Sequence, residues 1–212
     1  MPEIPVSIPV DSRVTLEGGF TPAPERAKGA ALVTHPHPLY GGSMHNNVVE
    51  ALLRAAAGAG WASLRFNFRG VGGSTGSHDQ GRGEEDDLLA AAAWLKERAE
   101  APLALLGYSF GSLVAANAAS RLPGLAGGIW VAPPLILGEL PPWPQDAGPL
   151  LIIVGSEDEY SQVGWLEEYV GGMGARGSLV IVQGGDHFFW GGESALIGQA
   201  REFLSNCTES GQ

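Results

Sequence analysis

The sequence has little cysteine and few basic side chains, and both shortages exclude classes of protein. Cys207 is the single cysteine among 212 residues, so no internal disulfide framework is expected and a reducing compartment fits. Twelve Lys and Arg stand against 23 Asp and Glu, which gives a formal net charge of −11. Because binding to nucleic-acid phosphates needs a cluster of basic side chains, we expect no nucleic-acid partner.

Long apolar runs are also lacking. No stretch is long enough to cross a bilayer without a charge, Gly or Pro, and residues 1–13 have neither the basic start nor the apolar run of a signal peptide. We therefore expect a cytoplasmic protein with no membrane span. The length and the 44% content of hydrophobic residues fit a single domain, residues 1–212. A monomer and a homodimer both remain open, since Trp165 could lie in a core or in an interface.

Strand-like and helix-like segments alternate along the chain. Two short strands are expected within residues 4–20, around a turn at Asp11. Six apolar runs typical of buried strands then begin near residues 30, 61, 103, 125, 149 and 178, and helical spacing is found at 46–60, 83–100, 112–122, 162–174 and 194–207. This alternation predicts an α/β fold whose mostly parallel central sheet carries helices on both faces, with ligands beyond the carboxyl ends of the strands.

The pattern Gly-X-Ser-X-Gly occurs twice, as GYSFG at 107–111 and as GGSTG at 72–76. In a nucleophile elbow a serine lies on a sharp turn from strand to helix, where side chains two positions away would collide. Gly111, at the end of the first match, leads at once into the helical SLVAANAASRL, whereas Gly76, at the end of the second, leads into the polar SHDQGRGEEDD. The context therefore favours Ser109 as a nucleophile and leaves Ser74 as its rival.

A serine nucleophile needs a base and an acid that orients the base. Asp158 follows the apolar LLIIVGSE and His187 follows SLVIVQGGD, so both stand at the ends of expected strands. Three nearby acids compete with Asp158 for the orienting role: Glu157, Glu159 and Asp186. We favour Asp158 for its place at the end of an expected strand, and because a residue directly before a histidine, such as Asp186, rarely places its carboxylate on Nδ1 of that ring. Ser109, Asp158 and His187 then follow one another in the chain order of α/β hydrolases.

Five blocks resemble the α/β-hydrolase fold, and most closely its small capless predicted hydrolases, a group close to the dienelactone-hydrolase-like esterases. The blocks are HPHPLYGGSMHNNVV at 35–49, LRFNFRGVGGSTG at 64–76, GYSFGS at 107–112, GSEDEY at 155–160 and GGDHFFW at 184–190. The resemblance implies the α/β-hydrolase fold without a cap domain. It also implies a serine carboxylesterase that forms an acyl-enzyme intermediate and uses no cofactor and no metal.

The same resemblance assigns roles to individual residues. Ser109 would attack, His187 would take its proton, and Asp158 would orient the imidazole. The oxyanion would lie between the amide of Phe110 and an amide of the loop after THPHP, from Leu39 or, as the next choice, Tyr40.

The site is expected to be open and to accept small esters. Ser109 and Asp158 are 49 positions apart (158 − 109), which leaves little room for a cap. Aromatic side chains are the candidates for the wall of an acyl pocket: Tyr40, Tyr108, Trp143, Tyr160, Phe188 and Trp190. We predict a preference for short-chain esters, while thioesters, lactones and a non-catalytic role in binding a small molecule remain open.

Other motifs carry weaker hypotheses. His35 and His37, with His45 or His78 as a third ligand, would make a metal site, but no partner recurs at ligand spacing. The loop GVGGSTG at 70–76 lacks the Lys-Ser/Thr of a phosphate-binding loop, so a tight turn is favoured. Two arginines, Arg65 and Arg69, are expected to form structural ion pairs, with binding of a substrate carboxylate as the lesser alternative.

Overall fold

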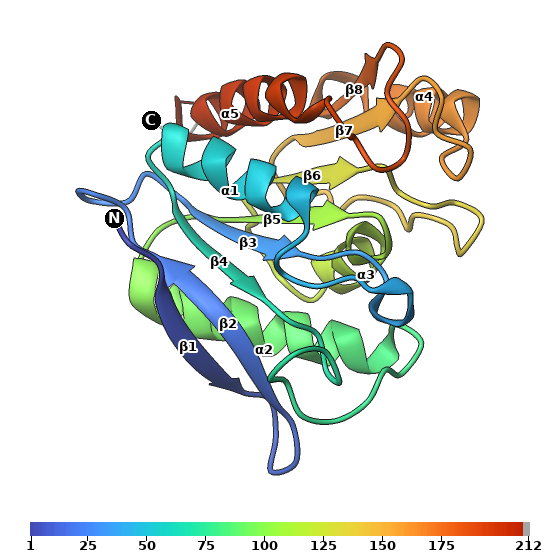
Figure 1. Cartoon of the computed structure of the whole chain (residues 1–212). Helices are drawn as coiled ribbons and strands as arrows, with labels where there is room; N and C mark the ends of the chain where they lie inside the picture. The colour runs from blue at the N-terminus through green and yellow to red at the C-terminus, as the bar shows by residue number, and fades with distance from the viewer. Residues whose placement is uncertain (210–212) are drawn as a thin grey trace.

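One sheet of eight strands runs through the chain in this computed structural model, which describes residues 1–209, with side chains up to residue 207 (Figure 1). The strand order is β1-β2-β4-β3-β5-β6-β7-β8. The strands are β1 (Ile4–Pro9), β2 (Thr15–Thr21), β3 (Ala30–Thr34), β4 (Ala62–Phe66), β5 (Leu103–Tyr108), β6 (Gly127–Val131), β7 (Leu150–Gly155) and β8 (Gly177–Val182).

Strands β1 and β2 form an antiparallel hairpin at one edge of the sheet, with Ile4 opposite Phe20 and Pro9 opposite Thr15. The expected turn between them is confirmed: Asp11 Oδ1 accepts hydrogen bonds from the amides of Arg13 and Val14, at 2.6 and 2.8 Å. Strand β2 also pairs antiparallel with β4, and every further pairing, from β4 through β8, is parallel. The carboxyl ends of six strands therefore meet at one edge of the sheet.

Helices cover both faces of the sheet, as the alternation predicted, and a hydrophobic core lies on each face. On one face, α1 (Asn47–Gly58) and α5 (Glu193–Glu209) pack together over the sheet. On the other face lie α2 (Arg82–Ala99), α3 (Phe110–Ala119) and α4 (Val163–Gly171) (Figure 1). Two short 3₁₀ helices complete the described elements: η1 (Pro38–Tyr40) and η2 (Gly174–Arg176).

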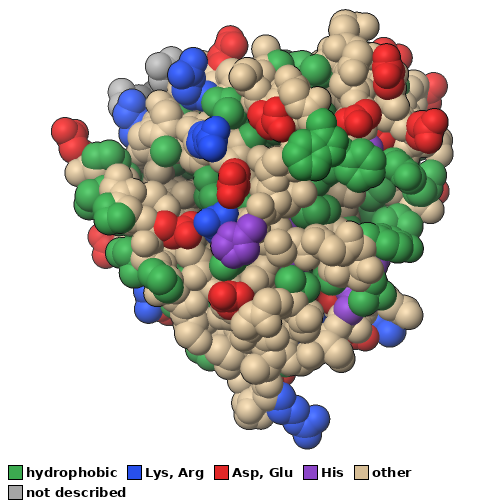
Figure 2. Space-filling model, viewed as in Figure 1, with side chains coloured by type: hydrophobic (Ala, Val, Ile, Leu, Met, Phe, Trp, Pro, Cys, Tyr) green, Lys and Arg blue, Asp and Glu red, His purple; other side chains and the backbone are tan. Residues whose placement is uncertain are grey.

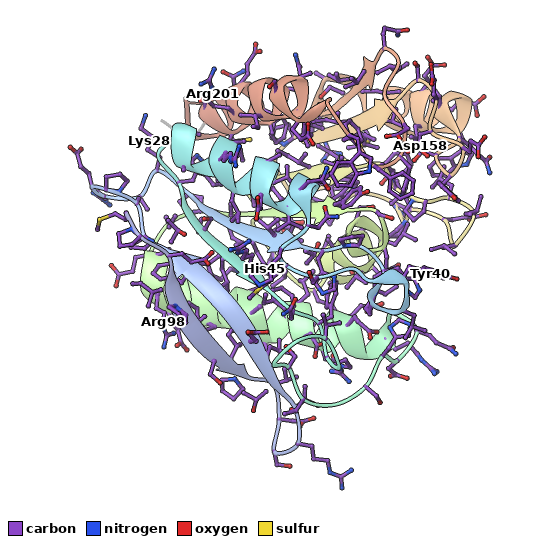
Figure 3. All side chains as sticks on the ribbon, viewed as in Figure 1. Lys28, Tyr40, His45, Arg98, Asp158 and Arg201 are labelled. Atoms are coloured by element: carbon purple, nitrogen blue, oxygen red, sulfur yellow. The ribbon has the colours of Figure 1, made fainter. Side chains whose placement is uncertain are left out.

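Residues 132–149, which connect β6 to β7, contain no helix, so no cap domain is inserted at the point where the resemblance excluded one. Within residues 1–209, no helix is both long and apolar enough to cross a membrane. Figure 3 shows Tyr40 and Asp158 on the side of the molecule where the parallel strands end, and Lys28 and Arg201 on the opposite side.

A buried ion pair fixes α2 to the end of β4. Asp87 is fully buried, and its carboxylate accepts from the backbone amide of Arg69 at 2.9 Å and from the guanidinium of Arg69 at 2.7 Å. The structural pairing expected of Arg69 is therefore confirmed. Arg65 forms the other expected pair, because its guanidinium donates to both carboxylate oxygens of Glu3, at 2.8 and 2.9 Å.

Removal of Asp87 alone from its ion pair with Arg69 should destabilise the fold. We expect Asp87→Ala to lower the free energy of unfolding by about 3 kcal/mol, because Arg69 would keep its charge without a partner. Asp86→Ala is the matched control, since Asp86 is exposed and meets Arg121 only at the surface. That variant should cost less than about 1 kcal/mol. Urea unfolding of both variants measures the difference, and equal losses would contradict the assigned role of Asp87.

Candidate active site

Ser109 lies on the turn between β5 and α3, and its backbone is strained. Its φ of 52° and ψ of −125° are values that a non-glycine residue rarely adopts. The turn is held by the Ser109 amide, which donates to Val131 O on the neighbouring β6 at 2.9 Å. A Cβ at Gly107 would approach Ser112 Cα to 2.5 Å, and one at Gly111 would approach His35 O to 2.6 Å. The two glycines of the motif are therefore required by close backbone packing.

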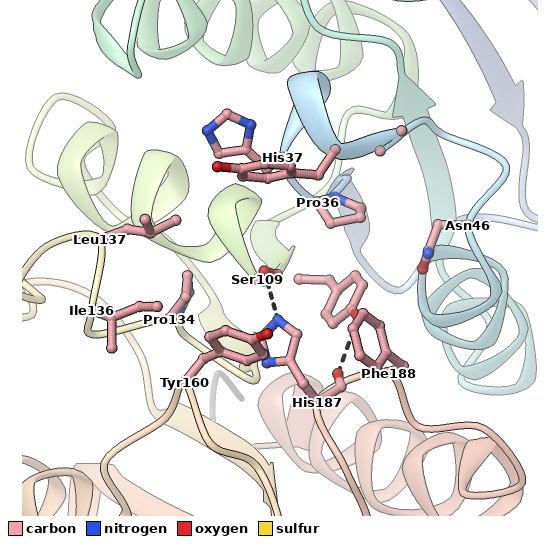
Figure 4. Close-up of a pocket in the computed structure, with 14 residues that line it drawn as sticks. Pro36, His37, Asn46, Ser109, Pro134, Ile136, Leu137, Tyr160, His187 and Phe188 are labelled. Atoms are coloured by element: carbon pink, nitrogen blue, oxygen red, sulfur yellow. Dashed lines mark hydrogen bonds between the residues drawn. The ribbon is translucent and has the colours of Figure 1, made fainter.

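A continuous chain of hydrogen bonds joins the three side chains that the sequence placed at strand ends. Ser109 Oγ lies 2.9 Å from His187 Nε2, and His187 Nδ1 lies 2.9 Å from Asp158 Oδ2. All three residues are buried. They come from the carboxyl-end loops of β5, β7 and β8, so the parallel sheet brings together positions up to 78 residues apart. Figure 4 shows the contact between Ser109 and His187 at the floor of a pocket.

Asp158 is the acid that reaches the imidazole. Burial raises the pKa of its carboxyl group, but the hydrogen bonds from His187 and from the Tyr160 amide, at 2.8 Å, outweigh burial and leave the pKa below its usual value. The three competing acids lie elsewhere: Glu157 and Glu159 are exposed, and Asp186 accepts from the amide of Phe188. Asp158 is thereby held as the anion that faces His187.

The loop that carries His187 is fixed from below by Tyr108. The hydroxyl of Tyr108 donates to His187 O at 3.0 Å, and burial raises the pKa of this hydroxyl well above its ordinary value. The ring of Tyr160 meets the imidazole edge to face, with 4.8 Å between ring centroids. These contacts leave Nε2 of His187 directed at Ser109.

Ser74, the rival serine, has a different environment. Its hydroxyl donates to Asn67 O at 2.7 Å and accepts from the amide of Glu17 at 2.9 Å. The bond to Glu17 connects the 70–76 loop to β2. The Glu17 carboxylate adds a second connection, because it accepts a hydrogen bond from the amide of Gly73 at 2.7 Å. The second Gly-X-Ser-X-Gly match is thus a structural turn.

The loop after β3 differs from the expected oxyanion arrangement. The Leu39 amide donates to His37 Nδ1 at 3.2 Å, and the Tyr40 amide donates to His37 O at 3.1 Å. Both amides are used inside their own 3₁₀ turn, so the structure does not support either one as an oxyanion donor. The amide of His37 has no hydrogen-bond acceptor within the described residues, and His37 lines the pocket. The amide of Phe110, first in α3, has no acceptor within its helix.

A pocket of about 460 Å³ opens above Ser109 and His187. Four of the six aromatic residues predicted to wall it do so: Tyr40, Tyr108, Tyr160 and Phe188. The prediction is wrong for the other two residues. Trp143 is buried against Trp130, with 5.7 Å between ring centroids, and its Nε1 donates to Gly148 O, so it belongs to the core. Trp190 is 73% exposed and lies outside the pocket lining.

Comparisons with known proteins agree with this fold. Residues 36–149 match the family model described as alpha/beta hydrolase fold. An uncharacterised protein of Rickettsia prowazekii is 35% identical over 188 residues, which is 82% of this chain and 77% of the relative. The chain belongs to the α/β-hydrolase family.

Two solved α/β hydrolases resemble it over nearly their whole length. A serine hydrolase homologue from Coxiella burnetii is 32% identical with a TM-score of 0.78, and the match covers 97% of this chain and 96% of that one. A protein from Xanthomonas campestris, described as a serine hydrolase without a lid, is also 32% identical, with a TM-score of 0.81 and coverage of 99% and 96%.

Sequence reasoning missed one wall of the pocket of this α/β hydrolase. Pro134, Ile136 and Leu137 follow β6 and line the side opposite Phe188 (Figure 4). They carry no motif, but β6 lies beside β5 in the parallel sheet, so the loop after β6 must begin next to Ser109. Asn46 is the N-cap of α1. It accepts from the Val48 amide at 2.9 Å and also lines the pocket.

His35, one of the candidate metal ligands, has structural partners instead. His35 is fully buried: its Nε2 accepts from the amide of Phe68 at 3.0 Å, and its Nδ1 faces Pro36 O at 2.6 Å. Since a carbonyl only accepts, Nδ1 carries the proton of the neutral ring. Among residues 1–209 no group of three or more His, Cys, Asp and Glu side chains is placed to hold a metal ion. His35 instead joins the loop after β3 to the end of β4.

His35 should make the fold sensitive to acid. Burial lowers its pKa from 6.5 to about 4, so the unfolded chain binds a proton in this interval that the folded chain does not. Stability should therefore fall as the pH drops from 6.5 towards 4, with about 3 kcal/mol coming from this one group. We expect His35→Gln to be less stable at neutral pH but to lose less on acidification.

Urea unfolding at several pH values measures this difference. His45→Gln is the matched control, because His45 is exposed and the variant should keep the native pH dependence. An unchanged dependence in His35→Gln would contradict the assignment.

Proposed function

We propose that this α/β hydrolase is a serine carboxylesterase that cleaves short-chain esters through an acyl-enzyme intermediate. The observation that carries the proposal is the hydrogen-bonded series Ser109, His187 and Asp158, with 2.9 Å at each of its two contacts. The serine hydrolase homologue of Coxiella burnetii and the serine hydrolase without a lid of Xanthomonas campestris, which both resemble this chain, support the same class of reaction. Each group used in the reaction is a side chain or amide of the chain itself, so the mechanism needs no cofactor.

In the first half of the reaction, Ser109 Oγ attacks the ester carbonyl carbon while His187 Nε2 takes its proton. Asp158, held as an anion, stabilises the imidazolium that forms. The oxyanion then accepts hydrogen bonds from the amides of Phe110 and His37. Loss of one such donor typically lowers kcat by a factor of about 10²–10³. When the intermediate collapses, the bond to the alkoxide breaks and His187 returns the proton to that leaving group. Water repeats the sequence on the acyl-enzyme and releases the acid.

The nucleophile can be tested with a fluorophosphonate probe, which labels activated serines. We expect the native protein to be labelled, Ser109→Ala to lose the label, and Ser74→Ala to keep it, since Ser74 Oγ is engaged by Asn67 and Glu17. Circular dichroism of both variants checks that they fold. Absence of labelling in the native protein would favour the non-catalytic, ligand-binding alternative, and loss of labelling in Ser74→Ala alone would make Ser74 the nucleophile.

The preference among simple acyl chains follows from the exposed rim of the pocket on the side away from His187, where Tyr40 is 83% and Leu137 51% exposed. A long flexible chain would extend past these residues into water and bury no more apolar surface. We therefore expect kcat/KM to be highest for short acyl chains across a series of p-nitrophenyl esters. A maximum at long chains would refute this preference. Hydrolysis of thioesters or lactones at a higher rate than esters would move the assignment to those substrates.

A further inference from the structure

A second cavity, of about 260 Å³, lies next to the first, and the two share His37 and Leu137 as walls. Its floor is the first part of α3, where Phe110, Leu113 and Val114 face it. Phe110 is the residue after Ser109, so this cavity begins one residue from the nucleophile. Its volume is below the roughly 300 Å³ at which whole small ligands are usually held, and it therefore suits one arm of a substrate.

One wall of this cavity is a loop held by a buried carboxylate. Glu84 is fully buried and accepts from the amides of Asp79 and Gly81, at 2.9 and 2.7 Å. Its Oε1 also lies 2.9 Å from Nδ1 of His78. This clamp holds Gln80 at a φ of 54°, a strained value for a residue with a side chain, and Gln80 lines the cavity. Strain of this kind gathers at sites that bind ligands or substrates.

The lining of this cavity is apolar at the floor and polar at the rim. Three rings meet there: His37 lies 4.7 Å from Phe110 and 4.9 Å from His78, measured between centroids. Because Nδ1 of His37 accepts from the Leu39 amide, the proton of the neutral ring is on Nε2, and burial lowers the pKa of His37. The carboxamide of Asn117 adds a donor and an acceptor at the rim.

None of the described residues that line this cavity is Lys or Arg, and Glu139 stands at its rim. A carboxylate on the substrate would therefore meet like charge without compensation. The two arginines that could bind a substrate carboxylate, Arg65 and Arg69, are already paired with Glu3 and Asp87. The cavity suits a neutral arm that combines a flat apolar ring with a hydrogen-bonding substituent.

The position of His187 determines which arm of the ester, acyl or alcohol, can enter the second cavity. In the proposed mechanism His187 returns its proton to the leaving alkoxide, so the alcohol arm must lie beside His187. His187 lines the first pocket and is not among the residues that line the second cavity. The arm that points away from His187, past Leu137, is the acyl arm.

We propose that the second cavity is an acyl subsite for a ring-bearing acyl group with a neutral polar substituent such as a hydroxyl. This inference rests on the proposed esterase function. It makes compact aromatic acyl esters, rather than simple aliphatic ones, the substrates that use the whole site.

Three methyl esters with the same leaving group test the subsite: methyl butanoate, methyl phenylpropanoate and methyl para-hydroxyphenylpropanoate. We expect kcat/KM of the native enzyme to rise in that order, with about a fivefold gain from the hydroxyl, the size of one net hydrogen bond. Asn117→Phe fills the cavity from an exposed position on α3 and should lower kcat/KM for both aromatic esters by about tenfold, leaving methyl butanoate within twofold of native.

Two further variants test whether the lower kcat/KM of Asn117→Phe comes from filling the cavity or from another effect of the substitution. Asn117→Ala removes the carboxamide without filling the space, so it should reduce only the advantage of the hydroxyl. Ser120→Phe places the same ring at the end of α3 outside both cavities and should change none of the three rates. Thermal melting verifies that each variant is folded.

The outcomes distinguish the two proposals. If methyl butanoate is hydrolysed but Asn117→Phe acts equally on all three esters, or no more than Ser120→Phe, the subsite is overturned and the esterase function stands. If the native enzyme hydrolyses none of the esters and the fluorophosphonate probe leaves Ser109 unlabelled, the esterase function is overturned and the subsite with it.

Discussion

The site depends on one close approach of backbone to backbone, where the first turn of α3 meets the end of β3. At Gly111 there is no space for a side chain, because a Cβ would lie 2.6 Å from His35 O and 2.8 Å from Thr34 O. The Thr34 hydroxyl donates to Gly111 O at 2.9 Å and closes the same contact. This packing sets the position of the Ser109 turn relative to the loop that carries His37. The two candidate oxyanion amides are therefore placed by the core of the protein and not by flexible side chains.

The strain at Ser109 is sustained by what surrounds it. A non-glycine residue at such dihedral angles costs of order 1–3 kcal/mol and persists only where the neighbouring structure over-determines it. Here β5 is buried along its whole length between β3 and β6, and α3 is buried on nearly all its faces. Hydrophobic cores on both sides of the sheet hold the strand and the helix, and the turn between them has no freedom to relax.

Much of the fold and part of the site could be predicted from the sequence, because both follow from periodic patterns. Apolar runs located the strands, and their order placed Ser109, Asp158 and His187 at a common edge of the sheet. The oxyanion loop could not be predicted in the same way, because its hydrogen bonds follow no period. The side chain of His37 accepts from the Leu39 amide, a local competition of side chain with backbone that composition does not reveal.

The prediction that Trp143 lines the pocket was wrong for a related reason. Trp143 stands in a Pro-rich segment that looked like a loop over the site, yet its ring packs in the core against Trp130. The sequence places a residue along the chain, but a surface connection such as 132–149 can direct a large side chain towards either solvent or the sheet. Leu137 lies in the same connection and faces the pocket, which only the three-dimensional path of the loop could reveal.

The absence of a helix between β6 and β7 has a kinetic consequence under the proposed mechanism. In hydrolases with a mobile cover, opening and closing on the microsecond to millisecond scale often limits turnover. Residues 132–149 form no helical cover, so under the proposed mechanism substrate entry and product departure would depend on diffusion and on the side chains of the rim. The acyl-enzyme would also stay in contact with bulk water throughout its lifetime. Transfer of the acyl group to another alcohol would then compete poorly with attack by water. The enzyme would therefore catalyse ester hydrolysis and not transesterification.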